Sequence, residues 1–149
     1  MEILIQNKKA RFNYEIVEEM NAGIELLGSE VKSLRAKQGT LDGAYVLARG
    51  GEAYLVGATI PAFQPNNTSA SYEPDRNRKL LLTKKELVEL TLNESKKGLT
   101  IVPLSVYNAG RHIKVRLAIV RGKKQFDKRE TIKQRDTERE MRRTLKNSI

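Results

Sequence analysis

Lysine and arginine side chains recur at short spacings in two parts of the sequence, and cations at such spacings bind phosphate oxygens. Residues 113–119 alternate between aliphatic and other side chains, as a strand with one buried face does. Lys114 and Arg116 then share the other face, about 7 Å apart, because a strand rises ~3.3 Å per residue. The spacing suits adjacent phosphates, although an ordinary solvated face explains two cations better.

A second pair of cations, Lys32 and Arg35, falls within a predicted short helix over residues 30–37. Side chains three residues apart are neighbours on a helix, and two like charges there weaken it by roughly 0.2–0.5 kcal/mol. An anionic partner at this surface would explain why the pair is tolerated. Chance is an equally good explanation for this helix taken alone.

The C-terminal residues 121–149 hold 11 Lys or Arg against 5 Asp or Glu, which is +6 of the net charge of +10. They are rich in helix formers. We expect this tail to be disordered when free and to fold as a helix on a polyanion, because a helix with so few apolar groups is marginal in water. Its few aliphatic side chains are Ile132, Met141, Leu145 and Ile149.

Catalytic chemistry is poorly supported by the residues present. The chain has one histidine, His112, and no cysteine, so a zinc site is not expected. No phosphate-binding loop or nucleophile elbow is found, and we expect no enzyme activity and no cofactor. A small RNA nuclease using Glu30 or His112 is the enzyme alternative.

Composition points to a nucleic-acid partner before an anionic membrane, because the isoelectric point is about 9.9. No apolar run approaches the ~20 residues that a membrane-spanning helix needs. With five Tyr, three Phe and no Trp, we expect RNA contacts through shape and phosphates more than through base stacking. We expect a cytoplasmic monomer.

Hydrophobic periodicity and turn residues predict a mainly β body of α+β class. The capping box at residues 83–86 begins its longest helix, which stops at Gly98. Residues 64–79 read as an exposed loop. Strands are expected over residues 14–18, 24–27, 44–48, 53–60, 100–106 and 113–120.

This order of elements predicts an antiparallel β-barrel of about six strands with flanking helices. Residues 1–120 would form the body, and residues 121–149 the basic tail.

Five segments together resemble the small protein B family, bacterial proteins that bind transfer-messenger RNA. The resemblance runs nearly the whole length of the chain. The segments are residues 7–11 (NKKAR), 22–24 (AGI), 28–35 (GSEVKSLR), 76–82 (RNRKLLL) and 122–129 (GKKQFDKR).

The resemblance implies an oligonucleotide-binding-type barrel that binds the tRNA-like domain of transfer-messenger RNA and enters stalled ribosomes with elongation factor Tu. Relatives commonly have Glu at the position of Asn21, and His or Tyr at that of Phe126. The RNA-binding positions that it implies, with Arg116 added from the strand pattern, are Asn7, Lys8, Arg11, Asn21, Lys32, Arg35, Leu81, Lys114 and Arg116.

For the tail, the resemblance implies a helix that occupies the empty message channel and decoding centre of the small ribosomal subunit. The alternative is a ribosomal or ribosome-assembly protein with a basic extension. The tail positions expected to act there are Lys123, Lys124, Phe126, Asp127, Lys128, Arg129, Lys133 and Arg135.

Overall fold

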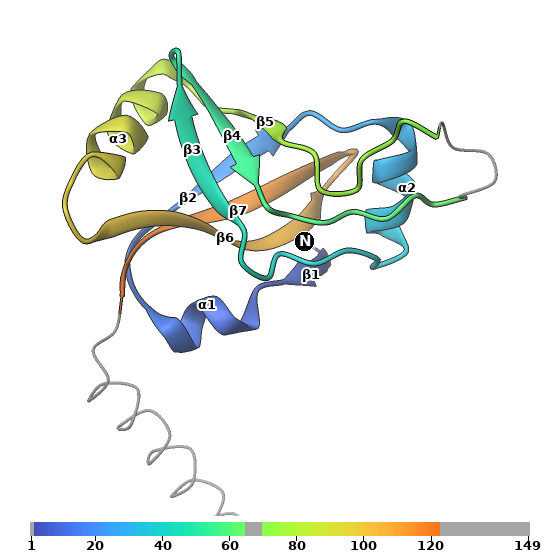
Figure 1. Cartoon of the computed structure of the whole chain (residues 1–149), viewed down its shortest axis with the longest axis horizontal. Helices are drawn as coiled ribbons and strands as arrows, with labels where there is room; N and C mark the ends of the chain where they lie inside the picture. Colours follow the sequence, from blue (N-terminus) through green and yellow to red (C-terminus); the bar gives the residue numbers. More distant parts are fainter. Residues whose placement is uncertain (1, 65–69, 123–149) are drawn as a thin grey trace, which may run out of the picture.

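The computed structural model describes residues 2–64 and 70–122, in which seven strands and three helices alternate along the chain (Figure 1). The elements are β1 (Glu2–Gln6), α1 (Lys8–Asn13), β2 (Tyr14–Ile24), α2 (Gly28–Arg35), β3 (Tyr45–Arg49), β4 (Glu52–Val56), β5 (Arg78–Leu81), α3 (Lys84–Glu94), β6 (Leu99–Ala109) and β7 (His112–Gly122).

All seven strands belong to one antiparallel sheet in the order β1-β6-β7-β2-β5-β4-β3. The prediction of a mainly antiparallel β fold with flanking helices is confirmed. The sheet has seven strands rather than about six, and its hydrogen bonding does not close a barrel, because β1 and β3 stand at opposite edges. Helices α2 and α3 lie at opposite ends of the sheet (Figure 1).

The alternation predicted for β7 is confirmed by its burial. Ile113, Val115, Leu117 and Ile119 are buried in the main core, while Lys114 is exposed and Arg116 half-buried. Ala118 and Val120 pack on the other face of the sheet, in a smaller cluster with Ala10 of α1. The far half of β7 is therefore covered on both faces, whereas its first half leaves one face to solvent.

Several boundaries differ from the prediction. The basic residues 7–11 belong largely to α1, and the two strands expected over residues 14–27 are one long strand, β2. Helix α2 begins at Gly28 rather than after Ser29, because the Glu30 carboxylate accepts the Leu27 N–H at 2.8 Å. The capping box of α3 is confirmed: the Thr83 hydroxyl accepts the Glu86 N–H at 3.2 Å.

Residues 64–79 are not wholly an exposed loop. Strand β5 begins inside that range, and Arg78 is fully buried. Within the described residues, no helix is long and apolar enough to cross a membrane.

Candidate nucleic-acid interface

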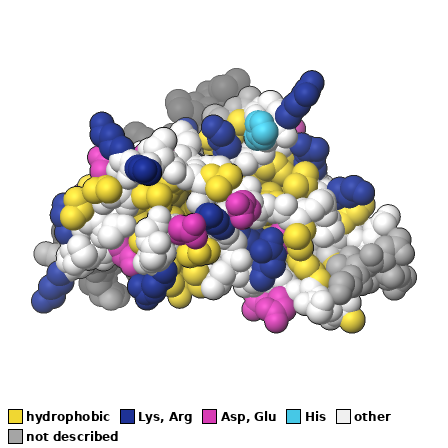
Figure 2. All heavy atoms as spheres, turned by 90° about the horizontal axis from the view of Figure 1, so that it is seen from above, with side chains coloured by type: hydrophobic (Ala, Val, Ile, Leu, Met, Phe, Trp, Pro, Cys, Tyr) yellow, Lys and Arg dark blue, Asp and Glu magenta, His cyan; other side chains and the backbone are white. Residues whose placement is uncertain are grey.

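Three of the predicted RNA-binding residues, Arg35, Leu81 and Lys114, line one hollow of about 360 Å³, which we call the Leu81 pocket. Its floor is apolar, with Ile24, Leu26, Val31 and Ile113 among the lining residues, and Arg111 and His112 add polar groups. Figure 2 shows Lys and Arg side chains beside the single histidine on this face. An apolar floor beside several cations suits a ligand that combines phosphates with flat apolar surfaces.

Strand register explains why Leu81 and Lys114 line the same pocket although they are 33 positions apart in the sequence. Gly23 of β2 pairs with Leu81 on one side and with Lys114 on the other, so the three residues form one row across β5, β2 and β7. A Cβ atom at Gly23 would lie 3.1 Å from the Leu81 Cβ, closer than such atoms normally approach. The absence of a side chain at Gly23 thus leaves room for the Leu81 side chain beside it. Leu81 remains 48% exposed.

Helix α2 supplies the third wall of the Leu81 pocket. The Arg35 Nη2 donates a hydrogen bond to the Arg111 carbonyl oxygen at 3.3 Å, which ties the last turn of α2 to the β6–β7 turn. Lys32, one turn earlier on α2, is exposed but does not line the pocket. The two cations predicted from the helix therefore have different surroundings.

A smaller hollow of about 120 Å³ brings together Asn7, Lys8, Arg11 and Arg116. Glu19 lies 4.0 Å from both Arg11 and Arg116, measured between the nearest nitrogen and carboxylate oxygen. These pairs are partly exposed, so they stabilise the fold little. They hold two guanidinium groups close to each other on one side of the sheet.

Asn7 belongs to the interior of the fold rather than to the open surface of this hollow. Its Oδ1 accepts the Ala10 N–H at 3.2 Å and caps α1, while its Nδ2 donates to the Pro103 carbonyl at 2.9 Å and, more weakly, to Leu41. Any effect of Asn7 on a ligand must therefore include its effect on where α1 lies.

Asn21 lies between the two hollows. It pairs with Arg116 across β2 and β7, two residues from the Gly23–Lys114 pair, and is exposed. Its Oδ1 accepts the Tyr107 hydroxyl at 2.9 Å. Among residues 2–64 and 70–122 its NH₂ group has no hydrogen-bond acceptor and can donate to a ligand, whereas a glutamate at this position would offer only acceptors.

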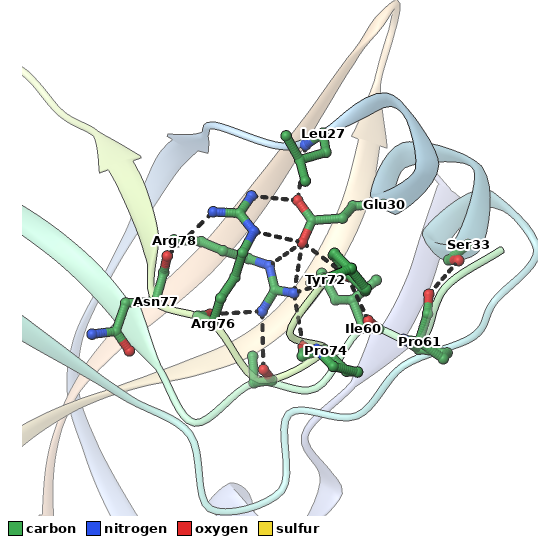
Figure 3. A network of polar contacts seen from close by, with 11 residues as sticks. Leu27, Glu30, Ser33, Ile60, Pro61, Tyr72, Pro74, Arg76, Asn77 and Arg78 are labelled. Carbon is green, nitrogen blue, oxygen red and sulfur yellow. Dashed lines mark hydrogen bonds and ion pairs between the residues drawn. The ribbon is translucent and has the colours of Figure 1, made fainter. Parts of the chain in front are cut away.

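A buried ionic network that joins α2 to β5 was not predicted from the sequence (Figure 3). The Glu30 carboxylate is fully buried, and it accepts hydrogen bonds from Arg78 Nε at 2.8 Å, from Arg76 Nε at 3.1 Å and from the Tyr72 hydroxyl at 3.1 Å. Burial alone would raise the pKa of Glu30, but the hydrogen bonds from Arg76, Leu27 and Arg78 together hold it below its usual value.

Arg78 extends this network to three backbone carbonyl groups. It donates to the Ala58 carbonyl at 3.0 Å, to Arg76 O at 3.0 Å and to Pro74 O at 2.8 Å. The signal for it was present in the sequence, since Arg78, Leu80 and Leu82 alternate as the inward positions of a strand do.

The geometry also bears on the nuclease alternative. Glu30 accepts bonds from two arginines and has no exposed surface, so it is not available to take a proton from water. His112 is exposed at the rim of the Leu81 pocket. In residues 2–64 and 70–122 no group of three or more His, Cys, Asp or Glu side chains could hold a metal ion.

Comparison with known sequences gives the family. The sequence model described as SmpB protein matches residues 4–147. The chain belongs to the SmpB protein family. The resemblance read from the five segments is thereby confirmed.

Relatives in the family are similar over nearly their full lengths. The SsrA-binding protein of Ligilactobacillus salivarius is 49% identical over 144 residues, covering 97% of this chain and 92% of that protein. The SsrA-binding protein of Wolbachia pipientis subsp. Culex pipiens is 46% identical over 150 residues, with 100% of both chains covered.

A solved structure is similar in fold as well as in sequence. It carries the description "tmRNA-SmpB: a journey to the center of the bacterial ribosome", and it is 43% identical with a TM-score of 0.69. The match covers 81% of this chain and 85% of that one. The tail positions predicted from the family resemblance, from Lys123 to Arg135, lie outside the described residues.

Proposed function

We propose that this chain binds the tRNA-like domain of transfer-messenger RNA and delivers it to stalled ribosomes for trans-translation. The observation that carries the proposal is the Leu81 pocket. Arg35, Leu81 and Lys114 come from α2, β5 and β7, and the fold brings these three predicted RNA-binding residues to one hollow. The names of the relatives, SsrA-binding proteins, support the same partner.

Binding in this proposal has no chemical step. Arg35, Lys114 and Arg116 hold phosphate oxygens, and Leu81 packs on a ribose or base that reaches the pocket floor. Asn21, between the cations, donates its amide to a base or ribose oxygen. Since each neutralised phosphate releases counterions, affinity should fall with salt at a slope of about −0.7 to −0.9 per phosphate.

The tail completes the proposed function. The part of the tail beyond β7, residues 123–149, would fold as a helix in the message channel of the small subunit, which is vacant only when message is absent. Ordering each residue costs about 1–2 kcal/mol of backbone entropy, so charge-assisted contacts of the 10 Lys and Arg side chains in residues 123–149 with ribosomal RNA would have to offset that cost. Elongation factor Tu would reach the complex through the RNA, and the chain would act as a monomer.

The test is RNA binding by the full-length chain and its variants. With a transcript of the tRNA-like domain, Lys114→Ala and Arg35→Ala should each weaken binding about tenfold, since hydrogen bonds to charged groups contribute ~1.5–3 kcal/mol. Each should also lower the salt slope by about 0.7–0.9. The matched control is Lys85→Ala, which removes an exposed cation of α3, outside the Leu81 pocket.

Equal affinity of all three variants would rule out the Leu81 pocket as the RNA site. A separate measurement distinguishes the rival class of ribosomal or assembly proteins. RNA that copurifies with the chain should be transfer-messenger RNA. Stoichiometric recovery on translating ribosomes would instead favour the rival.

A further inference from the structure

A third hollow, of about 430 Å³, lies between α1, the start of β3 and the start of β6. Its lining includes Tyr14, Tyr45, Asn13, Lys9 and Thr100. We call it the Tyr14–Tyr45 hollow. None of the predicted RNA-binding residues lines it except Asn7, whose amide is already hydrogen-bonded within the fold.

The Tyr14–Tyr45 hollow is separate from the Leu81 pocket. Tyr14 pairs with Gly122, the last residue of β7, and Thr100 pairs with Val120. Lys114 lies eight residues earlier on the same strand, which corresponds to about 26 Å at ~3.3 Å per residue. One nucleotide cannot reach both hollows.

The two tyrosines of this hollow differ from the other three in the chain. The hydroxyl groups of Tyr54, Tyr72 and Tyr107 each donate a hydrogen bond to a protein oxygen. In the part of the chain that the structure describes, the hydroxyls of Tyr14 and Tyr45 have no such partner. Rings that serve the fold are normally satisfied in this way when they are half-buried.

Tyr45 is placed for contact with a ligand rather than for packing. It lies on β3, one of the two edge strands of the sheet, and is 41% exposed. Tyr14 packs partly against the small cluster that contains Ala10 and Val102, which fixes its ring beside the hollow. The hollow therefore has one fixed aromatic wall and one open aromatic ring.

Polar groups complete the lining. Asn13 presents an amide, which offers both a donor and an acceptor to the edge of a base. Lys9 approaches Asp42 only loosely, with Nζ 3.8 Å from Oδ2, and is largely exposed. An aromatic ring, an amide and a cation around a hollow of this size are the groups that hold a single unstacked nucleotide.

We propose that the Tyr14–Tyr45 hollow receives one unpaired nucleotide of RNA. The base stacks on Tyr45, its edge is read by Asn13, and a flanking phosphate lies by Lys9. This inference rests on the proposed function only in taking RNA as the partner. The nucleotide would belong either to transfer-messenger RNA or to the ribosomal RNA that surrounds the start of the tail.

The experiment uses the absence of tryptophan from the sequence. In full-length Tyr45→Trp, the new indole is the only one present, and stacking on a base should quench its fluorescence. Titration with the tRNA-like-domain transcript and with purified small ribosomal subunits tests the two sources separately. Tyr54→Trp, on β4 and outside the hollow, is the matched control and should keep its emission in both titrations.

Affinity gives the second readout. Tyr45→Leu should weaken binding to the RNA that enters the hollow about tenfold, because stacking of a base on an aromatic ring contributes ~1–3 kcal/mol. Tyr45→Phe, which keeps the ring, should change it less than about twofold. Quenching of the Tyr45→Trp emission and loss of affinity of Tyr45→Leu in the same titration would support the inference. The titration in which both occur identifies the RNA that supplies the nucleotide.

Unchanged emission of Tyr45→Trp and wild-type affinity of Tyr45→Leu in both titrations would overturn it. Those results would leave the proposed function standing if wild-type protein still bound the transcript. Failure of the wild-type chain to bind the transcript would count against the proposed function instead.

Discussion

Glu30 and Arg78 form an ion pair in which neither side chain has any exposed surface, with Arg78 Nη2 2.6 Å from Glu30 Oε2. Glu30 lies in α2, which carries Arg35, and Arg78 begins β5, which carries Leu81. The pair therefore joins two of the elements that line the Leu81 pocket, α2 and β5. Removing one partner of a buried pair leaves the other charge uncompensated.

Glu30→Gln should lower the free energy of unfolding by about 3–5 kcal/mol, because Arg76 and Arg78 would lose their only carboxylate within the network. Urea denaturation at pH 7 measures this. Glu89→Gln, at an exposed position of α3, is the control and should change stability by less than about 0.5 kcal/mol. A loss below 1 kcal/mol for Glu30→Gln would contradict the importance of the pair.

The same carboxylate should make stability depend on pH. Its pKa is lowered from 4.5 in the folded state, so the unfolded chain binds a proton at higher pH than the folded chain does. The contribution of Glu30 is then fully present above about pH 5 and is lost as pH falls from 4.5 through the folded pKa.

Unfolding free energies between pH 7 and pH 3 would show this loss. In that acidic range the slope of stability against pH should be smaller for Glu30→Gln than for the wild type. Identical slopes would show that Glu30 does not titrate with a lowered pKa.

Gly23→Ala should weaken RNA binding several-fold while leaving the fold intact. The added Cβ would meet the Leu81 Cβ at 3.1 Å and its Cδ1 at 3.4 Å, and so would push Leu81 out of the row with Lys114. Gly28→Ala is the control, because nothing lies within 4 Å of its Cβ. Circular dichroism checks the fold, and a filter-binding titration with the tRNA-like-domain transcript checks the affinity. Equal RNA affinity of Gly23→Ala and Gly28→Ala would show that the position of the Leu81 side chain does not affect RNA binding.

Asn7→Ala should destabilise the protein by about 2 kcal/mol, since it removes a helix cap and a buried hydrogen-bond donor together. Thermal unfolding without RNA is the measurement. Asn7→Asp keeps the acceptor for the Ala10 N–H and should recover part of the loss. Unchanged stability of Asn7→Ala would show that the side chain acts at the surface alone.

Deletion of residues 123–149 should spare RNA affinity and abolish tagging of stalled peptides. The Leu81 pocket lies wholly within the described residues, and the tail is assigned to the ribosome. Binding to the transcript and tagging in a reconstituted translation reaction measure the two effects. Equal loss of RNA affinity and of tagging would contradict the assignment of RNA binding to the body and of the ribosomal role to the tail.

The elements predicted best from the sequence are those whose pattern is local. The alternation in β7 and the capping box of α3 depend on residues a few positions apart, and both are confirmed. The five family segments also led to the correct family. The row formed by Leu81, Gly23 and Lys114 could not be predicted in this way, because it depends on the register between strands, which no local pattern contains.

What the sequence could not show depends on partners far along the chain. The alternation of Arg78 with Leu80 and Leu82 indicates an inward position, but no local pattern identifies its partner Glu30, which lies 48 residues earlier. Asn7 resembles an RNA contact, yet its amide donates to Pro103, 96 residues later. The open sheet was likewise unpredictable, because closure depends on whether the first and third strands pair.

The two neighbours of β7 each contain one irregularity of register, between Ile16 and Glu18 in β2 and between Pro103 and Ser105 in β6. Strand β7 itself runs without interruption from His112 to Gly122. The length of β7 therefore sets the distance between the Leu81 pocket and the point where the tail begins. Inserting one residue into β7 would turn every side chain beyond the insertion to the opposite face. An insertion or deletion in β7 should therefore disturb RNA binding and the position of the tail as much as a substitution of Lys114 or Arg116 would.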